Sequence, residues 1–360
     1  MTLQAYMRVA WLWVRSRGLH ARLERVSETH SSVIQKDASP IQRHASPAWM
    51  TVKNILMRVV TTLPVLWLVV TIVFLLIHLV PGDPIVQMLG DGASAGDVES
   101  LRHSFGFDQP LHTQYWLYWR GILHGDFGRS LRLHDSVLHL VLQRYPYTLA
   151  LTVAGMLIGA VIAIPAGVAS ARTRNRWPDR TLGIASLFGL SFPNFALGPI
   201  LIVVFSIGLG WLPVSGAGVG PGEFLVHLIL PAVTLGLGMA AILTRMVRTS
   251  MLEELSQDYI RTARAKGLSE RRVVYAHALR NALNPVLTVM GLQFGSLLAG
   301  AIVTETIFSW PGLGRLTLSA ISNRDYALVQ GSILAIGLTY VAVNLLTDSL
   351  YALADPRMRR

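Results

Sequence analysis

The chain has 360 residues, of which 52% are hydrophobic and only 14% are charged. Soluble domains usually carry about 25% charged residues, so this composition indicates a membrane protein and argues against a soluble enzyme or nucleic-acid-binding domain. The net charge of +11 suits the basic cytoplasmic loops of membrane proteins, and the lack of cysteine excludes disulfides and thiolate chemistry.

Residues 1–50 form a basic extension whose apolar cluster is too short for a secretory signal peptide. Residues 27–47 are rich in Ser, His and Pro, a composition that predicts disorder. Met50 opens a sequence that runs straight into the first long apolar stretch, so we take Met50 as the natural start of the protein. Residues 51–360 are predicted to form one transmembrane domain.

Six apolar stretches are long enough to cross a bilayer as helices: residues 55–80, 148–169, 182–207, 225–244, 285–304 and 326–347. The expected fold class is therefore all-α, a polytopic membrane bundle of six transmembrane helices. Lys and Arg predominate in the extension, the C-terminal tail, and the loops 171–180 and 245–284. Because basic loops stay in the cytoplasm, both termini are predicted to be cytoplasmic and the segment 81–145 external.

Three features in or next to the spans have candidate roles. Phe192 and Pro193 interrupt the third stretch near its middle, which predicts either a broken helix lining a translocation path or a merely kinked packing helix, the reading we favour. Glu305, at the outer end of the fifth stretch, is expected to line an outer gate or to have a structural partner. Arg245 and Arg248 are expected to anchor the fourth span at the inner interface.

The loop 250–284 is predicted to form two short helices joined by Gly267. Ser256 is the expected N-cap of the first helix and Ser269 of the second. Gly267 stands where a helix end requires positive φ, and the second helix is expected to bend at Pro285 into the fifth span. A short helix held by a span at each end is able to transmit a push from a partner protein.

The residues of this loop expected to contact that partner are Tyr259, Arg261, Thr262, Ala263, Arg264, Ala265, Lys266 and Gly267. Two other interpretations of the loop remain. The first is an ordinary basic connector between spans. The second is a DNA-binding helix-turn-helix, which is disfavoured because membrane spans begin directly on both sides of the loop. The sequence has no phosphate-binding G-x-x-x-x-G-K-[ST] motif, no metal-ligand spacing and no catalytic constellation, so we expect no enzyme activity in this chain.

Several motifs together resemble one family. RTARAKG (Arg261–Gly267) resembles the EAA signature of the inner-membrane permease subunits of bacterial ABC importers. The B-type subunits of the dipeptide, oligopeptide and nickel branch have segments similar to HLVPGDP (78–84), HGDFG (124–128), HALRNALNPV (277–286), TETIFSWPGLG (304–314) and DPR (355–357). The resemblance covers residues 52–360.

This resemblance implies a bacterial inner-membrane complex of this chain, a homologous second permease, two ATPase subunits and an extracytoplasmic substrate-binding protein. The loop would be the coupling helix that engages an ATPase, and residues 310–314 would lie near the docking surface of the binding protein. ATP and Mg would be bound by the partner subunits, with no cofactor in this chain.

The implied cargo is a dipeptide or oligopeptide, with nickel or another small solute as the alternative. A self-sufficient secondary transporter is a competing hypothesis, but we find neither inverted repeats nor the buried acids of ion coupling. A membrane-tethered regulator that uses the basic loop is a third.

Overall fold

A computed structural model describes residues 48–79, 83–89, 94–104 and 106–354. The chain divides into two compact units, of which the larger is Val52–Met358. The predicted disorder of residues 27–47 and the DPR motif at 355–357 lie outside the described residues.

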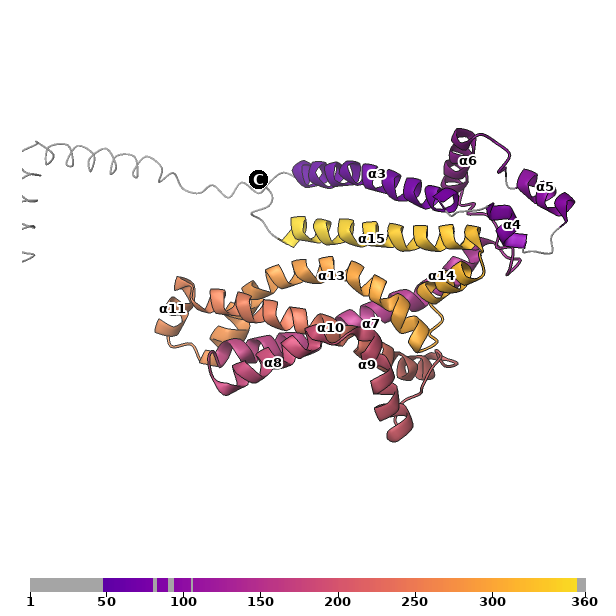
Figure 1. The fold of residues 1–360 in the computed structure, drawn as a ribbon. Coiled ribbons are helices and arrows are strands. Elements are labelled where there is room, and N and C mark those ends of the chain that lie inside the picture. The colour runs from indigo at the N-terminus through magenta and orange to yellow at the C-terminus, as the bar shows by residue number, and fades with distance from the viewer. Residues whose placement is uncertain (1–47, 80–82, 90–93, 105, 355–360) are drawn as a thin grey trace, which may run out of the picture. The chain divides into compact units, whose positions relative to one another are not determined.

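The described residues form helices joined by turns and loops, with one isolated β-bridge between Arg129 and Ser136 (Figure 1). In chain order the helices are α3 (Ala48–Leu79), α4 (Pro84–Leu89), α5 (Ala95–Ser104), α6 (Leu111–Leu123), α7 (Val137–Arg172), α8 (Trp177–Ser191), α9 (Asn194–Leu201), the π-helix η1 (Ile202–Gly208), α10 (Pro221–Leu255), α11 (Asp258–Ala265), α12 (Glu270–Arg272), the π-helix η2 (Val273–Ala278), α13 (Leu279–Ile307), α14 (Leu313–Ser322) and α15 (Tyr326–Ala354).

Length and composition confirm the predicted membrane bundle. Five helices of the described chain are long and apolar enough to cross a bilayer, and α8 with Phe195–Gly208 makes a sixth span if this bent pair counts as one. Several helices are longer than the apolar stretches from which they were predicted. The helix α10, for example, continues past Thr244 to Leu255. The segment 81–145, which was predicted to be external, contains the short helices α4, α5 and α6 and the first turns of α7.

The third span is broken rather than kinked, so the favoured expectation of a kinked packing helix is wrong. The axes of α8 and of Phe195–Gly208 differ in direction by 107°. Phe192 has extended backbone angles (φ −88°, ψ 120°) because the ring of the following proline disfavours helical angles before it. Pro193 is also extended, with ψ 133°, so α9 starts in a new direction.

Pro285 does not interrupt the helix that carries it. Pro285 lies inside α13, and residues 270–307 form one span candidate of 38 residues. Ala282 and Val286 are both buried beside the proline. We attribute the continuity to this packing, which holds the helix although proline lacks one backbone donor.

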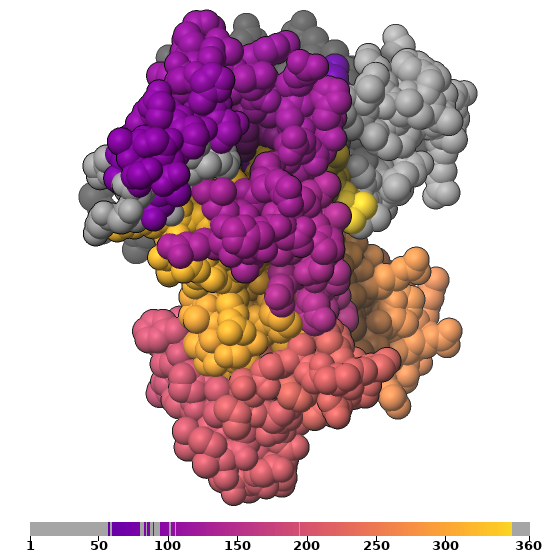
Figure 2. All heavy atoms as spheres, turned by 90° about the vertical axis from the view of Figure 1, so that its right-hand side faces the viewer, coloured from indigo at the N-terminus to yellow at the C-terminus, as the bar shows by residue number. Residues whose placement is uncertain are grey.

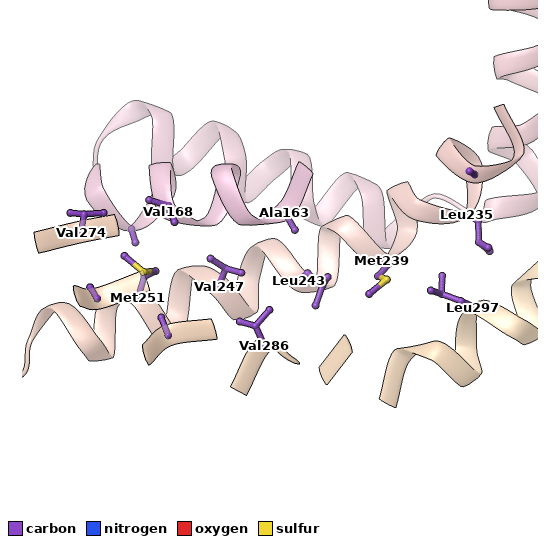
Figure 3. Close-up of a cluster of buried hydrophobic side chains, with 14 of the residues drawn as sticks. Ala163, Val168, Leu235, Met239, Leu243, Val247, Met251, Val274, Val286 and Leu297 are labelled. Atoms are coloured by element: carbon purple, nitrogen blue, oxygen red, sulfur yellow. The ribbon is translucent and has the colours of Figure 1, made fainter. Parts of the chain in front are cut away.

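The main core surrounds α10, whose side chains Leu243 and Val247 lie between α7 and α13 (Figure 3). Glycines allow α7 and α10 to approach closely, and a Cβ atom added to Gly236 would lie only 2.5 Å from the carbonyl oxygen of Gly155. Small residues at a helix contact are typical of membrane bundles, where van der Waals packing, in place of the hydrophobic effect, drives the association of helices.

A second layer consists of α3 and α15, which lie side by side in Figure 1. Val70 and Val73 of α3 are buried with Leu334 of α15, and Gln330 donates a hydrogen bond to the carbonyl oxygen of Val73 (3.1 Å). The helix α13 starts near α11 and runs the length of the bundle (Figure 1). The helices that follow it, α14 and the first turn of α15, therefore lie at the end of the bundle opposite α11, where α6 also lies. Figure 2 looks at that end.

Candidate functional site: the mounted helix α11

The helix α11 follows α10 after a two-residue turn. Ser256 is the C-cap of α10, where its hydroxyl donates to the carbonyl oxygen of Glu253 (2.7 Å), so the prediction of Ser256 as the N-cap of α11 is wrong. That position belongs to Gln257, whose backbone is extended (φ −70°, ψ 151°). The difference arises because α10 continues into the loop farther than its apolar stretch indicates.

The other end of α11 is a Schellman turn. The N–H of Gly267 donates to the carbonyl oxygen of Arg264 (2.9 Å), and the N–H of Leu268 donates to that of Ala263 (3.3 Å). Gly267 has φ +76°, which confirms the predicted left-handed position. Ser269 then stands at the N-cap of α12, as predicted. The turn therefore fixes the angle between α11 and the helix that leads into α13.

One face of α11 is buried in the main core. Ile260 is 0% exposed and Ala263 is 7% exposed, and both belong to the cluster that contains Met251 of α10 and Val273 and Val274 of η2. We expected Ala263 to be one of the small residues open to a partner surface, but its side chain faces inward. The helix therefore rests on both adjoining spans.

Two polar contacts tie α11 to its neighbours. The hydroxyl of Tyr259 donates to Glu254 of α10 and accepts a hydrogen bond from the amide of Asn281 in α13 (3.0 Å). Arg264 donates two hydrogen bonds to the carboxylate of Glu270, at 2.7 and 3.1 Å. Burial and the bond to Glu254 raise the pKa of Tyr259, and the bond to Glu270 raises the pKa of Arg264, so these groups remain a neutral hydroxyl and a charged guanidinium.

The partners Glu254, Asn281 and Glu270 were not predicted from the sequence. The available signal for the Arg264–Glu270 pair was a basic residue before Gly267 and an acidic residue after it, where Gly267 ends the helix. It becomes informative only once the direction of the turn is known.

The outer face of α11 is polar and exposed. Apart from Ala263, every residue predicted to contact a partner is exposed: Tyr259, Arg261, Thr262, Arg264, Ala265, Lys266 and Gly267. Arg261 pairs with Asp258 one turn away (3.2 Å), but both side chains are so exposed that the pair adds little stability. The result is a basic surface on a fixed support.

A second polar cluster lies where the helices α7, α8 and α10 meet. Arg248 of α10 donates to both oxygens of Asp179 at 2.7 and 2.8 Å, and Asp179 also accepts from the hydroxyl of Ser170 (2.5 Å) and the N–H of Asn175 (2.8 Å). Arg248 is therefore a structural partner of α8 rather than a simple anchor at the interface. The cluster joins the ends of α7, α8 and α10.

Glu305 has structural partners at the opposite end. Its side chain is 0% exposed and accepts hydrogen bonds from the hydroxyl of Thr148 (2.6 Å) and the N–H of Arg315 (2.9 Å). The Thr148 oxygen in turn accepts from the N–H of Leu313 (2.7 Å). These two side chains cap the first turn of α14, because Gly312 at its N-cap has no side chain.

The neighbouring turn, which the resemblance associates with docking of the binding protein, is partly buried. Trp310 is 0% exposed, and its indole N–H donates to the carbonyl oxygen of Tyr147 (3.0 Å). Its ring packs against Phe224, with ring centroids 5.2 Å apart. Trp310 therefore holds α13, α7 and α10 together.

The break in the third span borders an apolar cavity of about 520 Å³ between α7, α8, α9 and α10. Phe192 lines this cavity together with Phe188 and Leu237. Pro193 contributes the change of direction through its backbone.

Comparison with known proteins agrees with this architecture. Residues 51–152 match the family model "Binding-prot-dependent transport system membrane comp, N-term", and residues 163–360 match "Binding-protein-dependent transport system inner membrane component". The glutathione transport system permease proteins GsiC of Escherichia coli (strain K12) and Salmonella typhimurium (strain LT2) are each 45% identical over 305 residues, covering 85% of this chain and 98% of theirs.

Among solved structures, an inward-facing form of the MetNI methionine ABC transporter aligns with a TM-score of 0.51 at 22% identity, covering 60% of this chain and 96% of that chain. A second crystal form gives a TM-score of 0.50 at 20% identity, with 61% and 97% covered. At these identities the likeness shows the fold alone.

Proposed function

The chain belongs to the family of binding-protein-dependent transport system inner membrane components, and we propose that it is the permease subunit of an ATP-driven importer of short peptides. As a member of this family it is a multi-pass inner-membrane protein whose system includes an ATPase and a substrate-binding protein. In the proposed assembly a homologous second permease completes the translocation path, and two ATPase subunits bind the ATP and Mg. Both termini lie in the cytoplasm.

The mounting of α11 is the observation that carries this proposal. Ile260 is buried beneath it, and Tyr259 ties it to Glu254 of α10 and Asn281 of α13. Packed helices transmit displacement as rigid elements, so a push on the outer face of α11 would move both spans together. Closure of the ATPases on ATP would supply that push and turn the path outward, and hydrolysis would reset it.

The substrate class rests on the relatives. The proteins that share 45% identity are named as glutathione transport permeases, and glutathione is itself a short peptide. We extend that class, not that particular substrate, to this chain. The binding protein is expected to do most of the selecting, since the wall of a permease path is able to remain wide and weakly lined.

Uptake by a strain that lacks this gene tests the substrate class. We expect the deletion to reduce uptake of labelled dipeptide or glutathione to background, and the restored gene to recover it, while Ni²⁺ uptake is unchanged. Loss of Ni²⁺ uptake alone would assign the chain to nickel transport and contradict the peptide proposal. Peptide uptake that persists after the partner ATPase is inactivated would favour a secondary transporter.

A further inference from the structure

The short connection between α7 and α8 carries arginines without partners. Arg174, Arg176 and Arg180 are all exposed. Within the described part of the chain, their side chains make no ion pair and no hydrogen bond. The arginines of α11 differ, because Arg261 and Arg264 each have an acidic partner. The α7–α8 connection therefore presents positive charges that the described residues leave uncompensated.

The acidic residue of this connection, Asp179, does not offset these charges. Asp179 is only 6% exposed, and Arg248 of α10 pairs with both of its carboxylate oxygens. The carboxylate also accepts from the hydroxyl of Ser170 and from the N–H of Asn175, whose backbone has φ +63°. These bonds compensate the acid within the protein and hold the connection against α7 and α10, so the arginines stand on a fixed turn.

An exposed face of α8 continues from the arginines into the membrane span. Four of its residues recur at intervals of three and four and therefore share this face: Trp177, Arg180, Ile184 and Leu187. Trp177 is 76% exposed, Ile184 63% and Leu187 55%. The face is thus apolar along the span, with a tryptophan and an arginine at its end. Tryptophan and arginine are typical of the boundary between hydrocarbon and lipid headgroups.

A lipid suits this surface better than the partner ATPase does. The α7–α8 connection lies at the same end of the bundle as α11 (Figure 1), and an ATPase bound to α11 would approach from beyond the membrane. The face of Trp177 and Ile184, in contrast, points sideways from the span, where a bilayer surrounds it. Arg180 is about one helical turn from Ile184, so its long side chain reaches the depth of the lipid phosphates.

We propose that this surface binds an anionic phospholipid, with its phosphate on Arg176 and Arg180 and its acyl chains along Trp177, Ile184 and Leu187. Arginine suits the phosphate because its planar fork donates two parallel hydrogen bonds. Basic residues beside a bilayer are attracted to anionic headgroups, and salt screens that attraction. The proposal is independent of the transported substrate and makes anionic lipid a structural partner of α8.

The test is native mass spectrometry of the full-length protein purified with its partner subunits in detergent and titrated with phosphatidylglycerol or phosphatidylcholine. We expect saturable retention of phosphatidylglycerol and far weaker retention of phosphatidylcholine. The double variant Arg176→Gln/Arg180→Gln should weaken the retention of phosphatidylglycerol about tenfold or more. The double variant Arg132→Gln/Arg324→Gln is the matched control, because it removes the same charge from exposed arginines at the opposite end of the bundle. It should retain the lipid like the unchanged protein.

Equal retention of phosphatidylglycerol by the Arg176→Gln/Arg180→Gln variant and the unchanged protein would overturn the proposal. So would retention of phosphatidylcholine as strong as that of phosphatidylglycerol. Binding of phosphatidylglycerol that begins only after the partner subunits are removed would show that a protein covers this face, and it would overturn the proposal as well. If the double variant does not assemble, Arg180→Gln alone takes its place and is expected to weaken retention severalfold.

Discussion

Replacing Gly267 by valine is expected to abolish substrate uptake while the protein still inserts into the membrane. Gly267 has φ +76°, a backbone conformation that a β-branched residue rarely adopts. A Cβ atom at this position meets no atom within 4 Å, so the penalty comes from the backbone and not from a clash. The Schellman turn would open, and α11 would lose its fixed angle to α12. Uptake of labelled substrate, with the membrane level of the protein measured in parallel, provides the test.

The matched control changes the same residue. Asparagine tolerates the left-handed region, so Gly267→Asn should retain most of the uptake. Gly267→Pro should behave like the valine variant, because proline fixes φ near −65°. Normal uptake kinetics in Gly267→Val would show that the angle of α11 does not matter and that the coupling role is wrongly assigned.

The second large effect is expected at Glu305. Glu305→Ala removes the acceptor for the Thr148 hydroxyl and the N–H of Arg315, and each buried group left unpaired costs about 1–3 kcal/mol. We expect a markedly lower thermal unfolding temperature in detergent, with a matching loss of uptake.

Two further variants separate a structural role from a gating role. Glu305→Gln keeps one acceptor oxygen and should lie between Glu305→Ala and the unchanged protein in stability. Glu223→Ala is the exposed control, where one hydrogen bond to the N–H of Val219 (2.7 Å) is lost at little cost. An unfolding temperature of Glu305→Ala equal to that of the unchanged protein would contradict the capping role. A stable Glu305→Gln that does not transport would favour a gate.

The sequence was sufficient to predict the bundle and the position of Gly267, because both follow from local patterns. Apolar length marks the part of a helix that lies in hydrocarbon, and a glycine after a basic helical turn marks a helix end. The same patterns could not show that α10 continues to Leu255, since its last turns are supported by protein contacts. The N-cap was therefore misplaced at Ser256.

The structural roles of Glu305 and Arg248 depend on contacts between distant parts of the chain. Thr148 is 157 residues away from Glu305, and Asp179 is 69 residues away from Arg248. No periodicity links such positions, so the sequence left Glu305 open between a gate and a structural role, and indicated for Arg248 only an anchor at the interface. The break after Phe192 was visible as a disruption, but its angle depends on how α9 packs after Pro193.

The direct test of contact between α11 and an ATPase is cysteine cross-linking, to which this chain contributes no background because it has no cysteine. Thr262→Cys and Ala263→Cys are neighbouring variants, one on the exposed face of α11 and the other buried. In membranes that contain the whole complex, we predict that Thr262→Cys cross-links to cysteines placed along the ATPase surface and that Ala263→Cys does not. Absence of any cross-link from Thr262→Cys, or its labelling by a membrane-impermeant thiol reagent added outside intact cells, would contradict this account.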